Sequence, residues 1–218
     1  MNARGFSFIE LVVSIALLLM VAGSMFDFVH SARGVFEIDL ERADMHQRVR
    51  VGMDALFRDL VMAGAGLQIP AVVPFRRGLV DPDPPESGFP DRISVVYVPP
   101  DVTAGSATIT YARHVGPAGV PHLTRYDGIA TELPLVDHVA DLRFEYFDLE
   151  GNQMATARLA DGPWIPNAVA VDRFDADLLA IRRVRAIVRV RPARAFVGLP
   201  VADLEVRIDV SPRNLNLQ

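Results

Sequence analysis

The sequence predicts an α+β protein in which one long N-terminal helix packs on a mainly antiparallel β-sheet domain. Three observations predict this arrangement. The first 69 residues contain no proline and carry apolar side chains at helical spacing. From residue 92 onward, segments of alternating apolar and polar residues are typical of strands. A strand with one apolar face needs a cover, and the helix offers a matching apolar stripe.

The composition excludes several kinds of site. The chain has 218 residues, enough for one ordinary domain with an appendage. It contains no cysteine, so disulfides and thiolate metal sites are excluded. The net charge of −5 argues against a general nucleic-acid binder, because such domains are usually basic.

The first helical segment is long enough to cross a membrane. Phe6 to Phe26 is a run of 21 residues, which as a helix spans about 30 Å, the thickness of a bilayer core. The residues that follow, 27–30, do not form the small-residue cleavage site of a secretory signal. The segment is therefore expected to stay with the mature protein. Its polar side chains are Ser7, Glu10, Ser14 and Ser24.

Glu10 needs an explanation in such a segment. A charged group costs about 2.5–3.5 kcal/mol at the centre of a membrane helix and less near its end. One reading is that Glu10 lies at the membrane interface and is tolerated there. The other is that it pairs with a positive group that is absent before the chain is processed. Cleavage after Gly5 would give Phe6 a positive amine one helical turn away, which Glu10 of the same chain or of a neighbour could meet.

The stretch GFSFIEL, with Arg4 before it and an apolar helix after it, resembles the class III signal of type IV pilins and pseudopilins. The resemblance implies that a prepilin peptidase cuts between Gly5 and Phe6 and methylates the new amino group of Phe6. It also implies that Glu10 is the glutamate that pairs with this amine during assembly.

An amphipathic helix is predicted to continue from the membrane segment. Between Val35 and Val61 apolar residues recur three or four positions apart. The helix is expected to end around residues 63–66, and a kink, if one occurs, near Gly23 or Gly34. The apolar positions are Ile38, Met45, Val49, Met53, Leu56, Phe57 and Leu60, and the charged positions between them are Glu37, Glu41, Arg42, Asp44, Arg48 and Asp59.

The rest of the chain predicts strands joined by turns. Residues 78–91 are rich in proline and acids and predict a loop, and residues 160–178, with Trp164, predict an irregular insertion. The strands are expected at 92–98, 107–113, 122–126, 132–136, 140–148, 181–191 and 201–210. Three of them have an apolar face: Leu142, Phe144 and Tyr146; Val184, Ala186, Val188 and Val190; and Leu204, Val206, Ile208 and Val210.

Four parts are expected along the chain. Residues 1–5 form a leader peptide and residues 6–29 a transmembrane and assembly helix. Residues 30–65 continue this helix in amphipathic form, and residues 66–218 form a β-rich periplasmic domain.

No catalytic motif stands out, so neither an enzyme nor a cofactor is expected, and the five histidines show no ligand spacing. Asp172, Asp175 and Asp177 are a weak candidate for a calcium site, since calcium prefers several loop oxygens. Solvated acids are the favoured reading of these three residues. The acids around Gly151 predict a hairpin turn instead of a calcium loop.

An arginine stripe is the feature that most suggests DNA binding. Alternation places four arginines on one strand face, and the next strand carries acids on its polar face. Cross-strand ion pairs across a hairpin at 193–200 explain this pattern better, so no nucleic acid is expected. The arginines are Arg183, Arg185, Arg189 and Arg191, and the acids are Asp203, Glu205 and Asp209.

Three further segments, 54–67, 135–152 and 211–217, resemble parts of PilW-like minor pilins, and J-type minor pseudopilins of type II secretion share similar features. The resemblance implies a minor pilin, a structural subunit that lies in the bacterial inner membrane before joining a pilus, with the tip as its candidate position. Its partners would be the prepilin peptidase and other major and minor pilins, through the N-terminal helices. The alternatives are a secretion pseudopilin and a membrane-tethered periplasmic binding or adhesion domain that never polymerises.

Overall fold

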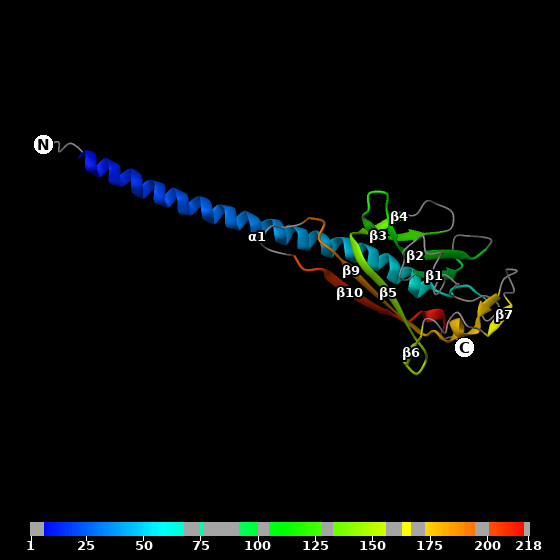
Figure 1. The fold of residues 1–218 in the computed structure, drawn as a ribbon. Coiled ribbons are helices and arrows are strands. Elements are labelled where there is room, and N and C mark those ends of the chain that lie inside the picture. The colour runs from blue at the N-terminus through cyan, green and yellow to red at the C-terminus, as the bar shows by residue number, and fades with distance from the viewer. Residues whose placement is uncertain are drawn as a thin grey trace.

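The computed structural model describes residues 7–67, 75, 92–99, 105–127, 133–155, 163–166, 173–194 and 201–215. The predicted loop at 78–91 lies outside these residues. One helix precedes all the strands (Figure 1). The elements are α1 (Phe8–Met62), β1 (Arg92–Tyr97), β2 (Ala107–Val115), β3 (Pro121–Tyr126), β4 (Leu133–Asp137), β5 (Val139–Phe147), β6 (Gln153–Met154), β7 (Trp164–Pro166), β8 (Arg173–Asp175), the 3₁₀ helix η4 (Ala176–Ala180), β9 (Arg183–Val190), β10 (Leu204–Val210) and the 3₁₀ helix η5 (Arg213–Leu215).

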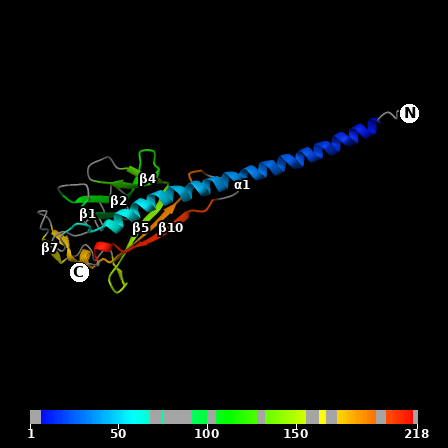
Figure 2. The same ribbon diagram turned by 180° about the vertical axis from the view of Figure 1, so that it is seen from behind.

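Helix α1 dominates the shape of the molecule. Its 55 residues correspond to about 80 Å at 1.5 Å per residue. The N-terminal half projects alone, and the C-terminal half lies along the strands (Figures 1 and 2). The helix is continuous through Gly23 and Gly34. It ends where the sequence predicts: Gly64 and Gly66 have φ angles of 78° and 69°, which favour glycine and stop the helix.

The strands form two four-stranded antiparallel sheets instead of one. The first has the order β1-β2-β3-β4 and the second β10-β9-β5-β6. Helix α1 contacts both sheets, through β1 and β4 of the first and β9 and β10 of the second. All seven predicted strands are present. The α+β arrangement of one long helix on antiparallel sheets is confirmed, and it is consistent with the pilin fold.

The prediction of an irregular insertion at 160–178 is wrong in part. Strands β7 and β8 pair in a short antiparallel ladder that joins Trp164 to Asp175, and η4 follows directly. Neither segment shows an alternation of apolar and polar residues long enough to predict a strand. The pairing depends on the contact between the two segments, not on their local pattern.

The predicted apolar faces form the core between the helix and the sheets. Six of the seven apolar helix positions are buried, as are the predicted faces of β5 and β9. On β10 only Val210 is buried, and its other three apolar residues are half-buried against the core. Phe57 is the exception on the helix: it is 48% exposed, because it lies 100° from Leu56 around the helix axis.

Two charged residues expected on the solvent side of α1 are buried instead. Glu41 is 9% exposed and Asp59 is 6% exposed. Each lies three residues after a buried apolar residue, Ile38 or Leu56, and therefore on nearly the same helix face. Buried carboxylates need partners, and both receive them from distant parts of the chain, as described below.

Gly52 is where α1 approaches the first sheet most closely. A β-carbon at this position would collide with Cγ2 of Val136, a fully buried side chain of β4. Gly52→Ala is therefore expected to destabilise the protein by about 1–3 kcal/mol, because overpacking outweighs the higher helix propensity of alanine. Urea denaturation checks this change in the free energy of unfolding.

Gly34→Ala is the matched control, since a β-carbon there meets nothing within 4 Å. Val136→Ala combined with Gly52→Ala should restore part of the lost stability. Equal stability of Gly52→Ala and the wild-type chain would show that α1 does not dock closely against β4.

Candidate functional site: the apolar end of the long helix

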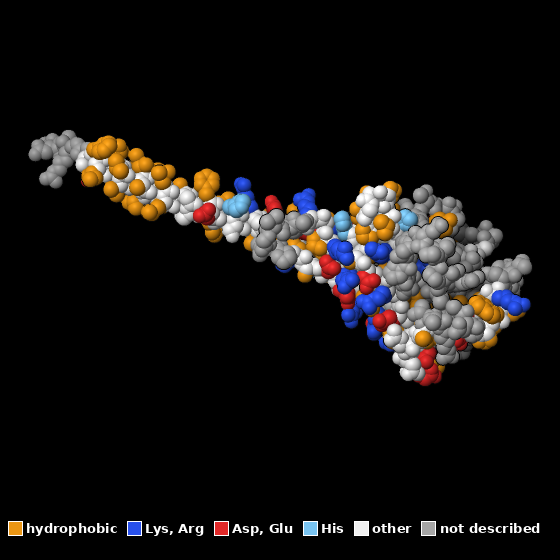
Figure 3. All heavy atoms as spheres, in the orientation of Figure 1, with side chains coloured by type: hydrophobic (Ala, Val, Ile, Leu, Met, Phe, Trp, Pro, Cys, Tyr) orange, Lys and Arg blue, Asp and Glu red, His pale blue; other side chains and the backbone are white. Residues whose placement is uncertain are grey.

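The first part of α1 is apolar around its whole circumference. Its large side chains are exposed: Leu18 by 67% and Phe26 by 77%. Orange side chains cover this end of the molecule in Figure 3. Within the described residues, α1 is the one helix long and apolar enough to cross a membrane. An exposed apolar surface of this extent requires a lipid or protein environment.

Glu10 lies in the first turn of α1. Its Oε2 accepts a hydrogen bond from the backbone N–H of Ser7 at 3.0 Å, and its backbone carbonyl accepts one from Oγ of Ser14 at 2.7 Å. A carboxylate is favoured at a helix N-terminus, where it also meets N–H groups that have no partner within the helix. Glu10 is exposed and thus free to face a second cation. Gly5 and Phe6 lie outside the described residues.

A buried polar network fixes the other end of α1 to the first sheet. One Asp59 oxygen, Oδ2, accepts hydrogen bonds from the Tyr111 hydroxyl at 2.6 Å and from Nε of Arg125 at 2.8 Å. The other, Oδ1, accepts one from the Tyr97 hydroxyl at 3.4 Å. The three donors come from β1, β2 and β3. One helix carboxylate therefore joins three strands.

The network keeps both tyrosines neutral. Burial raises the pKa of Tyr111 well above its ordinary value of 10, and the negative charge of Asp59 raises it further. Burial and Asp59 raise the pKa of Tyr97 in the same direction. Both hydroxyls therefore remain hydrogen-bond donors to Asp59 throughout the neutral range.

Glu41 ties the middle of α1 to the end of β9. Its Oε1 accepts a hydrogen bond from the backbone N–H of Ala193 at 2.6 Å. Nη2 of Arg48 lies 3.6 Å from the same oxygen, and Arg48 also pairs with Asp44 at 2.8 Å. The carboxylate thus has both a donor and a counter-charge. This contact marks the point beyond which the helix leaves the strands.

The calcium candidate is only partly within the described residues, because Asp172 lies outside them. Asp175 is buried, and its Oδ1 accepts a hydrogen bond from the backbone N–H of Asp177 at 2.8 Å, which caps η4. Across the described ranges no three His, Asp or Glu side chains gather as metal ligands. The reading of these residues as solvated acids is therefore wrong for Asp175, whose buried carboxylate accepts the backbone N–H of Asp177.

The turn predicted around Gly151 is present. Gly151 has a φ of 85° and joins β5 to β6. The backbone N–H of Asn152 donates to Oδ1 of Asp148 at 2.8 Å, and its side-chain amide donates to Oδ2 at 3.2 Å. Both carboxylate oxygens of Asp148 thus close the hairpin.

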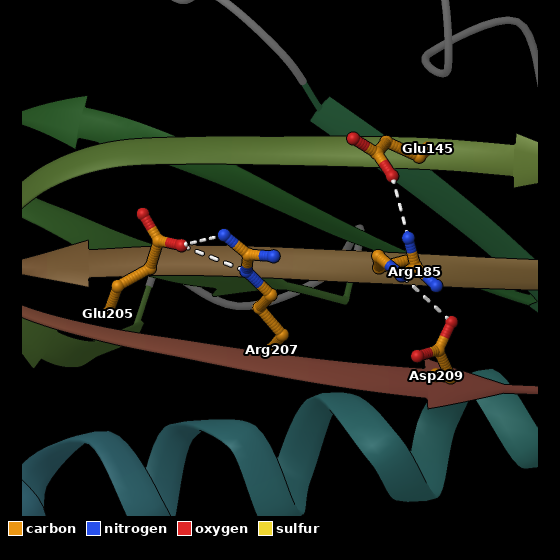
Figure 4. Close-up of polar contacts among 5 residues, drawn as sticks. All are labelled: Glu145, Arg185, Glu205, Arg207 and Asp209. Atoms are coloured by element: carbon orange, nitrogen blue, oxygen red, sulfur yellow. Dashed lines mark hydrogen bonds and ion pairs between the residues drawn. The ribbon is translucent and has the colours of Figure 1, made fainter.

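The predicted cross-strand ion pairs are confirmed in part: Arg185 and Arg189 pair with acids of β10 or of the segment before it, whereas Glu205 pairs with Arg207 of its own strand. Arg183 lies over the Phe147 ring. Arg185 lies directly opposite Asp209 of β10, and its Nε is 3.0 Å from that carboxylate. Its Nη1 lies 3.3 Å from Glu145 of β5, on the other side of β9, which the sequence analysis missed (Figure 4). Arg189 pairs with Asp203 at 3.9 Å.

Blue and red side chains alternate over this face (Figure 3). The acids raise the pKa of the Arg185 guanidinium, mainly through the hydrogen bond with Asp209. The charges are therefore balanced within the sheet.

The start of the chain is similar to a known family. Residues 1–26 match the family model described as the prokaryotic N-terminal methylation motif. No curated protein matches the chain. The match covers the leader, Glu10 and the apolar start of α1. It supports a type IV pilin or pseudopilin, a structural subunit that is processed by prepilin peptidase. Together with the apolar helix it supports anchoring in a membrane.

Proposed function

We propose that this protein is a minor type IV pilin, a non-enzymatic subunit that is cut and methylated by prepilin peptidase and then incorporated into a pilus. One observation carries the proposal. A membrane-length helix that is apolar on all sides presents a carboxylate in its first turn, inside a match to the N-terminal methylation motif. A helix that only anchors a protein in a membrane does not need a carboxylate at this position.

The assembly step follows from the chemistry of this helix end. Cleavage between Gly5 and Phe6 creates a positive amine at Phe6, which methylation leaves charged. In the fibre, Glu10 pairs with the amine of an adjacent subunit, while apolar helices pack against one another. A buried ion pair is tolerated when both partners are present, and either charge alone is penalised. Assembly is therefore favoured only for processed subunits.

In this proposal the four expected parts have distinct places. Residues 1–5 are removed, and residues 6–29 first cross the inner membrane and later pack in the fibre. Residues 30–65 continue the helix beside the globular part, and residues 66–218 lie in the periplasm. The partners are prepilin peptidase, the membrane and the helices of other pilins.

Two of the segments that resemble PilW-like minor pilins contact each other, and this contact supports a PilW-like minor pilin. The segment 54–67 ends α1, and 211–217 includes η5. The side-chain amide of Asn214 donates to the carbonyl of Ala63 at 3.3 Å. The segments 54–67 and 211–217, which resemble PilW-like minor pilins, thus meet at the C-terminal end of α1.

The mature N-terminus tests the proposal. In cells that contain prepilin peptidase, mass spectrometry of the purified chain is expected to show Phe6 as the first residue, carrying one methyl group. A Gly5→Ala variant should keep Met1, because the peptidase requires the glycine in this family. A wild-type chain that still starts at Met1 in peptidase-competent cells would exclude the proposal.

Deletion of the gene distinguishes a pilus subunit from a secretion pseudopilin. Loss of surface pili with normal secretion is expected for a minor pilin, and loss of secreted enzymes for a J-type pseudopilin. A membrane-tethered domain that never polymerises should purify without other pilins in mild detergent. Copurification with them is the expected result.

A further inference from the structure

Two histidines form a pair on the face of the first sheet that points away from α1. His114 of β2 and His122 of β3 are directly opposite each other, and their ring centroids are 5.4 Å apart. Alternation sets their direction, because the adjacent Leu123 points into the core and Arg125 reaches Asp59 of α1. Both rings are half-buried, so they combine a fixed position with access to solvent.

A carboxylate continues the row on the next strand. Asp137 of β4 is the register partner of His122 and is exposed. Directly opposite residues have Cβ atoms about 4.5–5.5 Å apart and point to the same face. Two imidazoles and one carboxylate therefore lie side by side across β2, β3 and β4. The three residues come from three consecutive strands and are aligned by the strand register.

The spacing of the rings matches that of two imidazoles on one metal ion. Zinc lies about 2.0–2.1 Å from a histidine nitrogen, and the ring centre lies about 1 Å further along the same line. Two rings on a tetrahedral ion therefore have centres about 5 Å apart. The observed 5.4 Å is close to this value, and the ring planes are tilted by 53° instead of being stacked.

The surroundings of His122 orient its ring for such a role. Its Nδ1 lies 3.1 Å from the backbone carbonyl of Val120. A ring nitrogen that donates to a carbonyl carries the proton, so Nε2 keeps its lone pair. Metal-binding histidines are typically held in this way. Gly116 makes room for the ring, because a β-carbon there would lie 3.0 Å from Cε1 of His122.

We propose that His114 and His122 form a binding site for a divalent transition-metal ion, with Zn²⁺ as the principal candidate and Asp137 as an additional oxygen ligand. Imidazole donors suit zinc, nickel and copper, whereas calcium prefers oxygen alone. No described group already presents three ligands around one point, so the carboxylate turns toward the histidine pair on binding. The bound ion would link β2 to β3. This site is independent of the N-terminal segment and of fibre assembly.

Titration of the untagged full-length protein with ZnCl2 tests the site. The chain is held in mild detergent near neutral pH, and binding is followed by isothermal calorimetry. One equivalent of zinc is expected to bind and to raise the thermal midpoint. His114→Gln and His122→Gln should each weaken binding at least about tenfold, since even the loss of a group that only orients a ligand costs 10–100-fold. CaCl2 should produce no such shift.

His46→Gln is the matched control, because His46 is exposed on α1 and outside the pair. It should bind zinc like the wild-type chain. Without metal, all three variants should melt near the wild-type temperature, which separates a lost ligand from a lost fold. Absence of zinc binding by the wild-type chain, or undiminished binding by the His114 and His122 variants, would overturn the proposal.

Discussion

Glu10→Gln is expected to leave cleavage and methylation at wild-type levels and to reduce incorporation into the fibre at least tenfold. Glutamine has the shape of glutamate and can still accept the hydrogen bond from the Ser7 N–H seen in the first turn of α1. Only the negative charge is lost. The methylated amine of the neighbouring subunit would then be buried without its counter-charge.

The size of the effect follows from the cost of breaking a buried ion pair. Removing one partner costs about 3–5 kcal/mol, and each 1.4 kcal/mol is tenfold in an equilibrium. Partial access of water at the fibre surface reduces this cost, so tenfold is the lower bound. The measurement is the ratio of the protein in sheared fibres to that in the membrane fraction, by immunoblot.

Glu37→Gln is the matched control, since Glu37 is an exposed carboxylate of the same helix outside the apolar segment. It should assemble normally. Glu10→Ala should behave like Glu10→Gln, because both lack the charge. If Glu10→Gln enters fibres as well as the wild-type chain, Glu10 does not pair with the amine.

Asp59→Ala is expected to destabilise the globular part by about 3 kcal/mol, the largest loss among substitutions at a single polar residue. The change removes the acceptor shared by Arg125, Tyr111 and Tyr97. A guanidinium and two hydroxyls would then remain beside the core with unmet hydrogen-bonding needs. Removing one partner of a buried ion pair costs about 3–5 kcal/mol. We expect the lower end of this range, because the Arg125 side chain is 25% exposed and is partly solvated.

Urea unfolding of the full-length chain in mild detergent, followed by the fluorescence of Trp164, gives the free energy of unfolding. Asp54→Ala is the matched control: Asp54 is an exposed aspartate of the same helix, and its loss should change stability by less than about 0.5 kcal/mol.

A double-mutant cycle isolates the Asp59–Arg125 pair. Asp59→Ala with Arg125→Met should cost less than the sum of the two single changes, because the second removes the cation that the first leaves unpaired. The network does not anchor α1 if the two changes in the free energy of unfolding simply add. The same follows if Asp59→Ala lowers this free energy only as much as Asp54→Ala does.

The sequence by itself predicts what local patterns control. The extent of α1 follows from apolar spacing and the absence of proline, and its end from the glycines at 64 and 66. The alternation in β5, β9 and β10 predicts their buried faces. The opposition of Arg185 and Asp209 also follows from the alternation, which places arginines and acids on the polar faces of two consecutive antiparallel strands. The class III signal is likewise a contiguous motif.

Only the tertiary structure shows what depends on segments distant in sequence. It places Asp59 among three strands and Glu41 at Ala193. Helical spacing puts both acids near the buried face but does not identify these partners. It divides the strands into two sheets, with β5 beside β9, which brings Glu145 to Arg185. It also aligns His114, His122 and Asp137 in one row.

The physical reason is the range of the interactions. Helix and strand patterns arise because apolar side chains a few residues apart are buried on one face. The order of apolar and polar residues in the sequence shows this directly. The partners of a buried carboxylate are set by which segments become neighbours. Tyr111 lies 52 residues from Asp59 in the chain and Ala193 lies 152 residues from Glu41, and such pairs leave no local trace in the sequence. The histidine pair depends on the register of the β2–β3 hairpin.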